Sequence, residues 1–140
     1  MKPHHVRMYM EMAEVSAKYS HATRLKVGSI FVRDNRILSI GINGTPPNDD
    51  NCCEEIGSDG IQVTKENVIH SEQAGIYKAA RDGESLNGAS LFVTHSPCFK
   101  CSLAIISVGI KEVYFRNQYR EAKGIANLIK HGVLVYELTI

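Results

Sequence analysis

Two short segments of this 140-residue chain carry most of the side chains that could do chemistry: H-S-E at residues 70–72 and P-C-F-K-C at 97–101. Imidazole nitrogen and thiolate sulfur are preferred zinc ligands, and a catalytic zinc keeps one of its tetrahedral positions for water. Two cysteines three residues apart at a helix start lie on one face, so both sulfurs can reach one ion. The segments therefore predict an open zinc site formed by His70, Cys98 and Cys101.

Glu72 follows His70 by two residues, which places its carboxylate beside the predicted metal without making it a ligand. Zinc lowers the pKa of a bound water to roughly 7, so hydroxide is available at neutral pH. A neighbouring carboxylate can take the proton, deliver it to a ring nitrogen and then protonate the departing ammonia. Hydrolytic deamination of a nucleobase requires this set of groups. A C-x-x-C pair alone could instead serve a structural zinc or a redox site, but neither of those needs Glu72.

The composition agrees with a single domain that spans residues 1–140 and buries its own core. The formal net charge of +1 gives no excess that would favour nucleic acid or a membrane surface as the partner. No apolar run approaches the roughly 20 residues of a membrane span, and the first residues lack a signal-peptide core. We therefore expect a cytoplasmic protein, in which a C-x-x-C pair binds metal or is redox-active more often than it forms a structural disulfide.

Hydrophobic periodicity predicts the elements that must position these residues. A helix comes first, then a hairpin with turn chemistry at residues 34–35, and then strands that alternate with helices. The predicted helices span residues 4–20, 72–82, 98–108 and 121–130, and the predicted strands span 27–32, 36–42, 91–94, 113–115 and 133–136. This order predicts an α/β fold: a three-layer α/β/α sandwich with one mixed five-stranded sheet. Right-handed crossovers should bring the starts of the second and third helices together.

Two loops do not fit this periodic pattern. The segment G-I-N-G-T-P-P at 41–47 is tight and stiff, so it either ends a strand or lets the backbone approach a ligand closely. Residues 48–67 are acidic and irregular, and an irregular connection of that length is typical of a lid or binding loop. Within it, Cys52 and Cys53 could serve a second metal site, but two small buried side chains are the preferred interpretation because no nearby histidine completes a set.

At these motifs the chain resembles the zinc-dependent cytidine/deoxycytidylate deaminase family, and in particular its short deoxycytidylate (dCMP) deaminases, phage-encoded ones included. The resemblance covers nearly the whole chain and runs through K-V-G at 26–28, G-I-N-G-T-P at 41–46, N-C-C at 51–53, A-A-R-x-G at 79–83, S-P-C at 96–98 and G-I-K at 109–111. It implies a cytidine deaminase-like fold, zinc on His70, Cys98 and Cys101, and Glu72 as the proton shuttle. The implied reaction converts dCMP to dUMP, the precursor of thymidylate.

The resemblance also implies how substrate and effectors bind. It implies that Asn43 hydrogen-bonds the sugar, that Ser71 offers its backbone to the base, and that Pro97 contacts the substrate. Family members usually form homohexamers, and many are activated by dCTP and inhibited by dTTP. The effector site includes the loop that carries Gly41, Asn43 and Gly44.

The chain departs from the usual family pattern at three places. Ser71 stands where the family usually has alanine, and Ala74-Gly75 stands where it usually has Asn-Ala, so a polar group near the substrate is lost. H-A-T-R at 21–24 replaces a cysteine-containing stretch that some members have, so we expect no second structural zinc.

A nucleoside monophosphate requires cations, because phosphate is bound by charge-assisted hydrogen bonds. The candidates are Arg24, Lys26, Arg116, Arg120 and Lys123, with simple solvation as the alternative for each. Arg120, beside Tyr119, is the preferred one. The rival substrates are dCTP, cytidine, free cytosine and a base in tRNA, and a rival of another class is a non-catalytic zinc module. RNA binding should show a basic patch, which a near-neutral chain does not favour.

Overall fold

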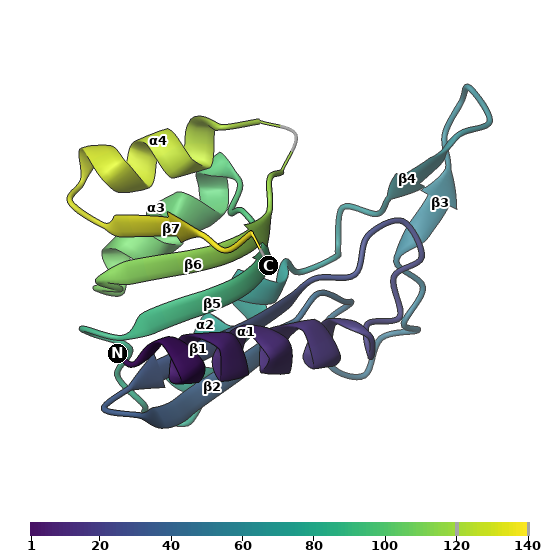
Figure 1. Cartoon of the computed structure of the whole chain (residues 1–140). Coiled ribbons are helices and arrows are strands. Elements are labelled where there is room, and N and C mark those ends of the chain that lie inside the picture. The colour runs from purple at the N-terminus through teal and green to yellow at the C-terminus, as the bar shows by residue number, and fades with distance from the viewer. Residues whose placement is uncertain (120, 140) are drawn as a thin grey trace.

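A computed structural model of the chain describes residues 1–119 and 121–139. The central sheet contains β1 (Gly28–Arg33), β2 (Arg36–Ile42), β5 (Ser90–His95), β6 (Glu112–Asn117) and β7 (Leu134–Glu137) (Figure 1). The helices are α1 (Pro3–Ala17), α2 (Ser71–Arg81), α3 (Phe99–Ser107) and α4 (Lys123–Lys130). Two short strands, β3 (Glu54–Ile56) and β4 (Gln62–Thr64), pair only with each other.

The central sheet is mixed, as the sequence predicted. Its strand order is β2-β1-β5-β6-β7, in which β1 is antiparallel to β2 and to β5, and β5, β6 and β7 run parallel. Asp34 and Asn35 join β1 to β2 with φ angles of 53° and 56°. Positive φ at both central residues is the requirement of a type I′ hairpin turn, and Asp and Asn tolerate it better than most residues.

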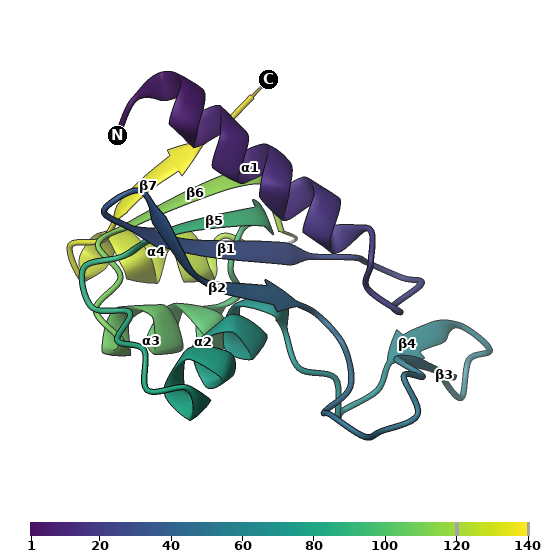
Figure 2. The ribbon, with the colours of Figure 1, turned by 90° about the horizontal axis from the view of Figure 1, so that it is seen from below.

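Helices cover both faces of the sheet, which confirms the predicted three-layer α/β/α sandwich (Figure 2). Helix α1 lies on one face, where Met10 and Ala13 pack with Phe92 of β5. The other three helices lie on the opposite face, and there Ile76, Ile105 and Leu128 share a core with alternate residues of the strands. In β5 this alternation is complete: Leu91 and Val93 face the three-helix side and Phe92 faces α1.

Residues 48–67 differ from the expectation of a loop without regular structure. Strands β3 and β4 form a hairpin that projects from the body of the molecule, and we call it the arm (Figure 1). The two strands have three residues each and are mostly exposed, so the sequence shows no alternation between buried and exposed positions. Periodicity could not reveal them, because it reports burial on one face. Within the described residues, no helix is long and apolar enough to cross a membrane.

Two glycines allow the close approaches on which the site depends. A Cβ atom at Gly41 of β2 would overlap the carbonyl oxygen of Ser71, so α2 can begin directly against this strand only because that position is glycine. A Cβ atom at Gly124 would overlap the carbonyl oxygen of Pro97, so the start of α4 packs against the turn that precedes α3.

Candidate active site

His70 is the N-cap residue that precedes α2, and hydrogen bonds of its own backbone and of the residue before it hold it in place. Its N–H donates to Oε1 of Gln73 (3.1 Å), which covers one of the unpaired donors at the helix start. The residue before it, Ile69, exchanges two backbone hydrogen bonds with Gly44, at 2.7 and 3.1 Å. The loop that follows β2 therefore positions the imidazole as well as forming part of the cavity described below.

Cys98 and Cys101 lie at the start of α3, directly after β5, and meet His70 there. Nδ1 of His70 is 3.3 Å from Sγ of Cys101 and 3.6 Å from Sγ of Cys98, and the three atoms lie within 4.8 Å of one another. Zinc bonds of about 2.3 Å to sulfur and about 2.0–2.1 Å to nitrogen place tetrahedral S and N ligands about 3.6 Å apart. The three predicted ligands therefore fit a zinc ion, and Nδ1 is the imidazole atom that would bind it.

The two thiols are electrostatically coupled. The pKa of Cys98 is lowered to about 4, chiefly because its sulfur accepts a hydrogen bond from the Cys101 thiol, while burial opposes the shift. The pKa of Cys101 is raised for the complementary reason, since it donates that bond and is buried. A divalent cation between them removes this competition and holds both as thiolates. Hydrogen bonding to Cys98 raises the pKa of His70 above its usual value.

Glu72 is 5% exposed and lies at the end of a short hydrogen-bonded chain of side chains. The Ser71 hydroxyl donates to Glu72 Oε1 (3.0 Å), and because its single proton is used there, the Ser29 hydroxyl is the donor in the 2.6 Å contact between the two serines. Burial raises the pKa of Glu72 above its ordinary value. A carboxyl group in such surroundings is suited to accept a proton and return it.

His70, Ser71, Glu72 and Cys98 line one cavity of about 370 Å³, which lies between the starts of α2 and α3 and the base of the arm. It is lined by His70, Ser71, Glu72, His95, Ser96, Cys98, Gln118 and Tyr119 around the helix starts, and by Ala22, Arg24, Leu25, Val27, Asn43, Glu54, Thr64 and Val68 toward the arm. A more open groove of about 660 Å³ shares His70 and Cys98 but not Glu72. The volume of the first cavity is that of a site for a small molecule.

Comparison with known proteins agrees with this geometry. Residues 3–117 match the family model described as the cytidine and deoxycytidylate deaminase zinc-binding region. The chain belongs to this family. It is 33% identical over 129 residues to the deoxycytidylate deaminase of Schizosaccharomyces pombe, spanning 40% of that protein's length, and 31% identical over 117 residues to that of Mycobacterium phage D29, spanning 90%. In these two alignments 87% and 76% of the present chain is covered.

Among solved structures, this family member is similar to the dCMP deaminase of cyanophage S-TIM5, which was crystallised in complex with dCMP and dUMP. The match covers 99% of each chain with 44% sequence identity and a TM-score of 0.92. The mixed sheet and its helices are thus those of the cytidine deaminase-like fold, as predicted.

Of the three residues predicted to contact the base or the sugar, two line the cavity and one does not. Asn43 lines the cavity, and its side chain accepts from Val27 N–H and donates to Leu25 O, both at 2.8 Å, so it also holds the segment before β1. Ser71 lines the cavity too. Pro97 is fully buried and does not line the cavity. It lies in the turn that precedes α3.

The predicted phosphate cations are dispersed. Arg24 lines the cavity and donates from Nη1 to Thr64 Oγ1 of the arm (2.7 Å). Nζ of Lys26 donates to Ser20 O (2.8 Å) and does not line the cavity.

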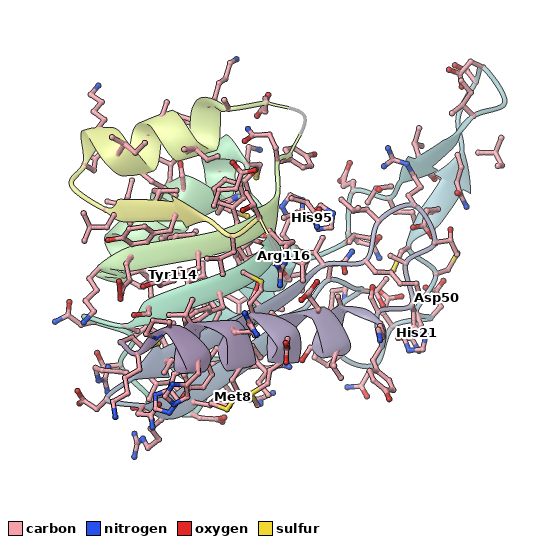
Figure 3. All side chains as sticks on the ribbon, viewed as in Figure 1. Met8, His21, Asp50, His95, Tyr114 and Arg116 are labelled. Atoms are coloured by element: carbon pink, nitrogen blue, oxygen red, sulfur yellow. The ribbon has the colours of Figure 1, made fainter. Side chains whose placement is uncertain are left out.

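Arg116 lies on the α1 face (Figure 3). Its Nη2 pairs there with Glu14 (3.0 Å), and it does not line the cavity. Lys123 lines the neighbouring open groove, and Tyr119 lines both the cavity and that groove. Arg120 lies outside the described residues.

Among the residues of the cavity wall that sequence reasoning missed are three polar ones, His95, Glu54 and Thr64. His95 had a usable signal, since it continues the alternation of Leu91 and Val93 and comes three residues before Cys98. Glu54 and Thr64 had none, because both belong to the arm. Of the two adjacent cysteines, Cys53 is buried as expected, but Cys52 is exposed, which corrects the expectation that both are buried.

Proposed function

We propose that this protein catalyses the hydrolytic deamination of dCMP to dUMP with release of ammonia, a step that supplies the precursor of thymidylate. The observation that carries the proposal is the near-complete match to the cyanophage enzyme crystallised with dCMP and dUMP. The buried carboxylate beside three zinc-ligating side chains, at the wall of a cavity of about 370 Å³, supports it independently of that match.

His70, Cys98 and Cys101 would hold the zinc ion. Zinc, when bound, supplies the Lewis acidity that makes water a nucleophile near neutral pH. Glu72 accepts the proton that the water gives up and passes it to the ring nitrogen beside the amine-bearing carbon. It then accepts the remaining proton from the hydroxyl group added to that carbon and gives it to the amino group, which leaves as ammonia as the carbonyl forms. Burial favours the protonated form of this carboxyl group, and the Ser71 hydroxyl holds one of its oxygens in a fixed direction.

The remainder of the cavity would bind the nucleotide. Ser71, at the helix start beside Glu72, offers its backbone to the base, and Asn43 contacts the sugar. Arg24 is the described cavity residue that carries a full positive charge, so it is our candidate for the 5′-phosphate. Tyr119, which also lines the cavity, and Arg120, the next residue in the sequence, are further candidates. With the phosphate on Arg24, it lies toward the arm and the reacting carbon lies toward the starts of α2 and α3.

The direct test is a substrate panel with the zinc-loaded protein. We expect the ultraviolet absorbance change of deamination with dCMP, and much slower or no change with dCTP, cytidine or cytosine. Glu72→Gln should retain zinc and lose turnover by about 10³-fold or more. Turnover of cytidine but not dCMP would contradict the substrate assignment, and zinc binding without turnover of any of these compounds would favour a non-catalytic zinc module.

We further propose that the protein is a homo-oligomer, a hexamer by family resemblance, and that dCTP and dTTP regulate it through the loop around Asn43. Exposed apolar side chains on α2 and α3, namely Tyr77, Phe99 and Leu103, support an interface on that layer. Light scattering of the purified protein measures the oligomer, and a monomer would contradict the first proposal. Deamination of dCMP with and without each triphosphate measures the regulation.

A further inference from the structure

His95 is a cavity residue for which the proposed reaction provides no role. It is the last residue of β5, and its ring is half-buried in the wall that also contains Glu72 and Cys98. In Figure 3 the ring lies at the edge of the sheet, on the side toward the arm. The histidine therefore reaches the space that the nucleotide would occupy, and it does so from a rigid strand rather than from a loop.

Hydrogen bonds to the neighbouring threonine determine which ring nitrogen carries the proton. Oγ1 of the buried Thr94 accepts from the backbone N–H of Gly28 (3.2 Å) and lies 3.1 Å from Nδ1 of His95. A hydroxyl has one proton, and Nδ1 is the acceptor that the described residues offer to it. A buried hydroxyl proton without an acceptor is costly, so Thr94 donates to Nδ1. The imidazole proton then belongs on Nε2.

The same surroundings keep the ring uncharged. Burial lowers the pKa of His95 below its ordinary value, and no carboxylate among the described residues is bonded to it. Nε2–H has no acceptor among residues 1–119 and 121–139. The cavity wall thus presents a neutral hydrogen-bond donor whose tautomer is set in advance, and a donor of this kind binds an oxygen acceptor without requiring a negative charge.

We propose that His95 is a substrate-binding residue that donates Nε2–H to an oxygen acceptor of the bound nucleotide, with Thr94 as the positioning residue that maintains the tautomer. This rests on the proposed deamination of dCMP. The shared chemistry is an oxygen acceptor, which belongs either to the base and sugar or to the phosphate. A donor fixed by a strand contributes to specificity because a ligand without a matching acceptor leaves it unpaired.

Two substitutions at His95 distinguish the loss of the Nε2–H hydrogen-bond donor from a change in the shape of the side chain. His95→Phe keeps a planar ring and removes the donor, whereas His95→Gln places an amide N–H near the position of Nε2. We expect His95→Phe to lower kcat/KM for dCMP by about ten-fold or more and His95→Gln to restore most of it. Zinc content and Tm should stay unchanged in both. His131→Gln, on the exposed end of α4, is the matched control and should behave as the wild type.

Comparison of dCMP with deoxycytidine locates the acceptor. If His95→Phe lowers kcat/KM for dCMP but not for deoxycytidine, the oxygen acceptor belongs to the phosphate. If kcat/KM falls equally for both substrates, the acceptor belongs to the base or the sugar. The proposal is wrong if His95→Phe turns over dCMP as the wild type does, or if His95→Gln is as impaired as His95→Phe.

A spectroscopic measurement on the wild-type protein tests the tautomer of His95 and its contact with the nucleotide directly. Nitrogen-15 NMR of labelled histidine should show the Nε2-protonated tautomer in the free protein and a changed Nε2–H resonance on addition of dUMP. The Nδ1-protonated tautomer, or no change with dUMP, would overturn the inference. Absence of dCMP turnover by the wild type would instead contradict the proposed function, and the dUMP titration would still report on His95 directly.

Discussion

At one end of the cavity, the metal-binding atoms come from the first turns of two helices packed on the central sheet, whereas at the other end Arg24 and Thr64 are exposed and belong to a loop and to the arm. Glu72 and Cys101 at the first end are buried. At the second end, Glu54 accepts hydrogen bonds from the backbone N–H groups of Thr23 and Arg24, at 2.9 and 3.1 Å, in exposed surroundings.

This difference separates the chemistry of the site from the choice of its ligand. Buried polar groups must keep their partners, so few substitutions are tolerated around the predicted zinc ion and Glu72. Exposed polar contacts contribute little free energy each, so the arm end can change without disturbing the fold. We expect variants at the helix starts to affect metal binding and turnover, and variants at the arm end to affect KM.

The largest effect should come from Cys101. Cys101→Ala removes a buried zinc ligand, so we expect loss of stoichiometric zinc and of all measurable deamination. Metal analysis and the absorbance assay measure both. Cys52→Ala, at an exposed thiol outside the cluster, is the matched control and should retain zinc and activity. Full zinc occupancy in Cys101→Ala would show that the ion is held elsewhere.

Alanine substitutions at two glycines test whether the start of α2 depends on its close contact with β2. Gly41→Ala introduces a Cβ that overlaps the Ser71 carbonyl, so it should lower the free energy of unfolding by about 2 kcal/mol and reduce turnover. The Cβ of Gly44→Ala meets open space, so this control should leave the free energy of unfolding within about 0.5 kcal/mol. Chemical denaturation measures both, and equal stabilities would mean that α2 can shift away from β2.

At the arm end, Arg24→Ala should raise KM for dCMP by about ten-fold while changing kcat little, because it removes a cation that acts mainly in binding. KM for deoxycytidine, which has no phosphate, should not change. Arg81→Ala, an exposed arginine at the end of α2, is the control. If KM rises equally for both substrates, Arg24 holds the arm through Thr64 rather than the phosphate.

The smallest effect should come from Ser71→Ala. It removes the hydroxyl that donates to Glu72 and leaves the backbone in place, so we expect kcat to fall by about three- to ten-fold with KM unchanged. Ser29→Ala should reproduce part of this loss, because it acts only through Ser71. Steady-state kinetics measure both variants, and a change in KM alone would show that Ser71 contacts the base rather than directing Glu72.

The sequence by itself identified the residues that could hold zinc and determined the fold class. His70, Cys98 and Cys101 could be predicted as a ligand set because ligand type and short spacing specify a zinc site locally, and Glu72 could be predicted beside it because it follows His70 by two residues. The strand and helix periodicities predicted the mixed five-stranded sheet, since each element buries one face and its sequence records that face. The arm escaped prediction because it buries almost nothing.

Only the tertiary structure decided which polar residues share the cavity. Arg24 and Arg116 are equivalent cations in the sequence, yet one lines the cavity and the other pairs with Glu14, 102 residues away, on the α1 face. Which polar side chains meet in one cavity depends on how elements far apart in the chain pack together, and local spacing does not record that packing. The same holds for the tautomer of His95, which Gly28 of a different strand helps to set through Thr94.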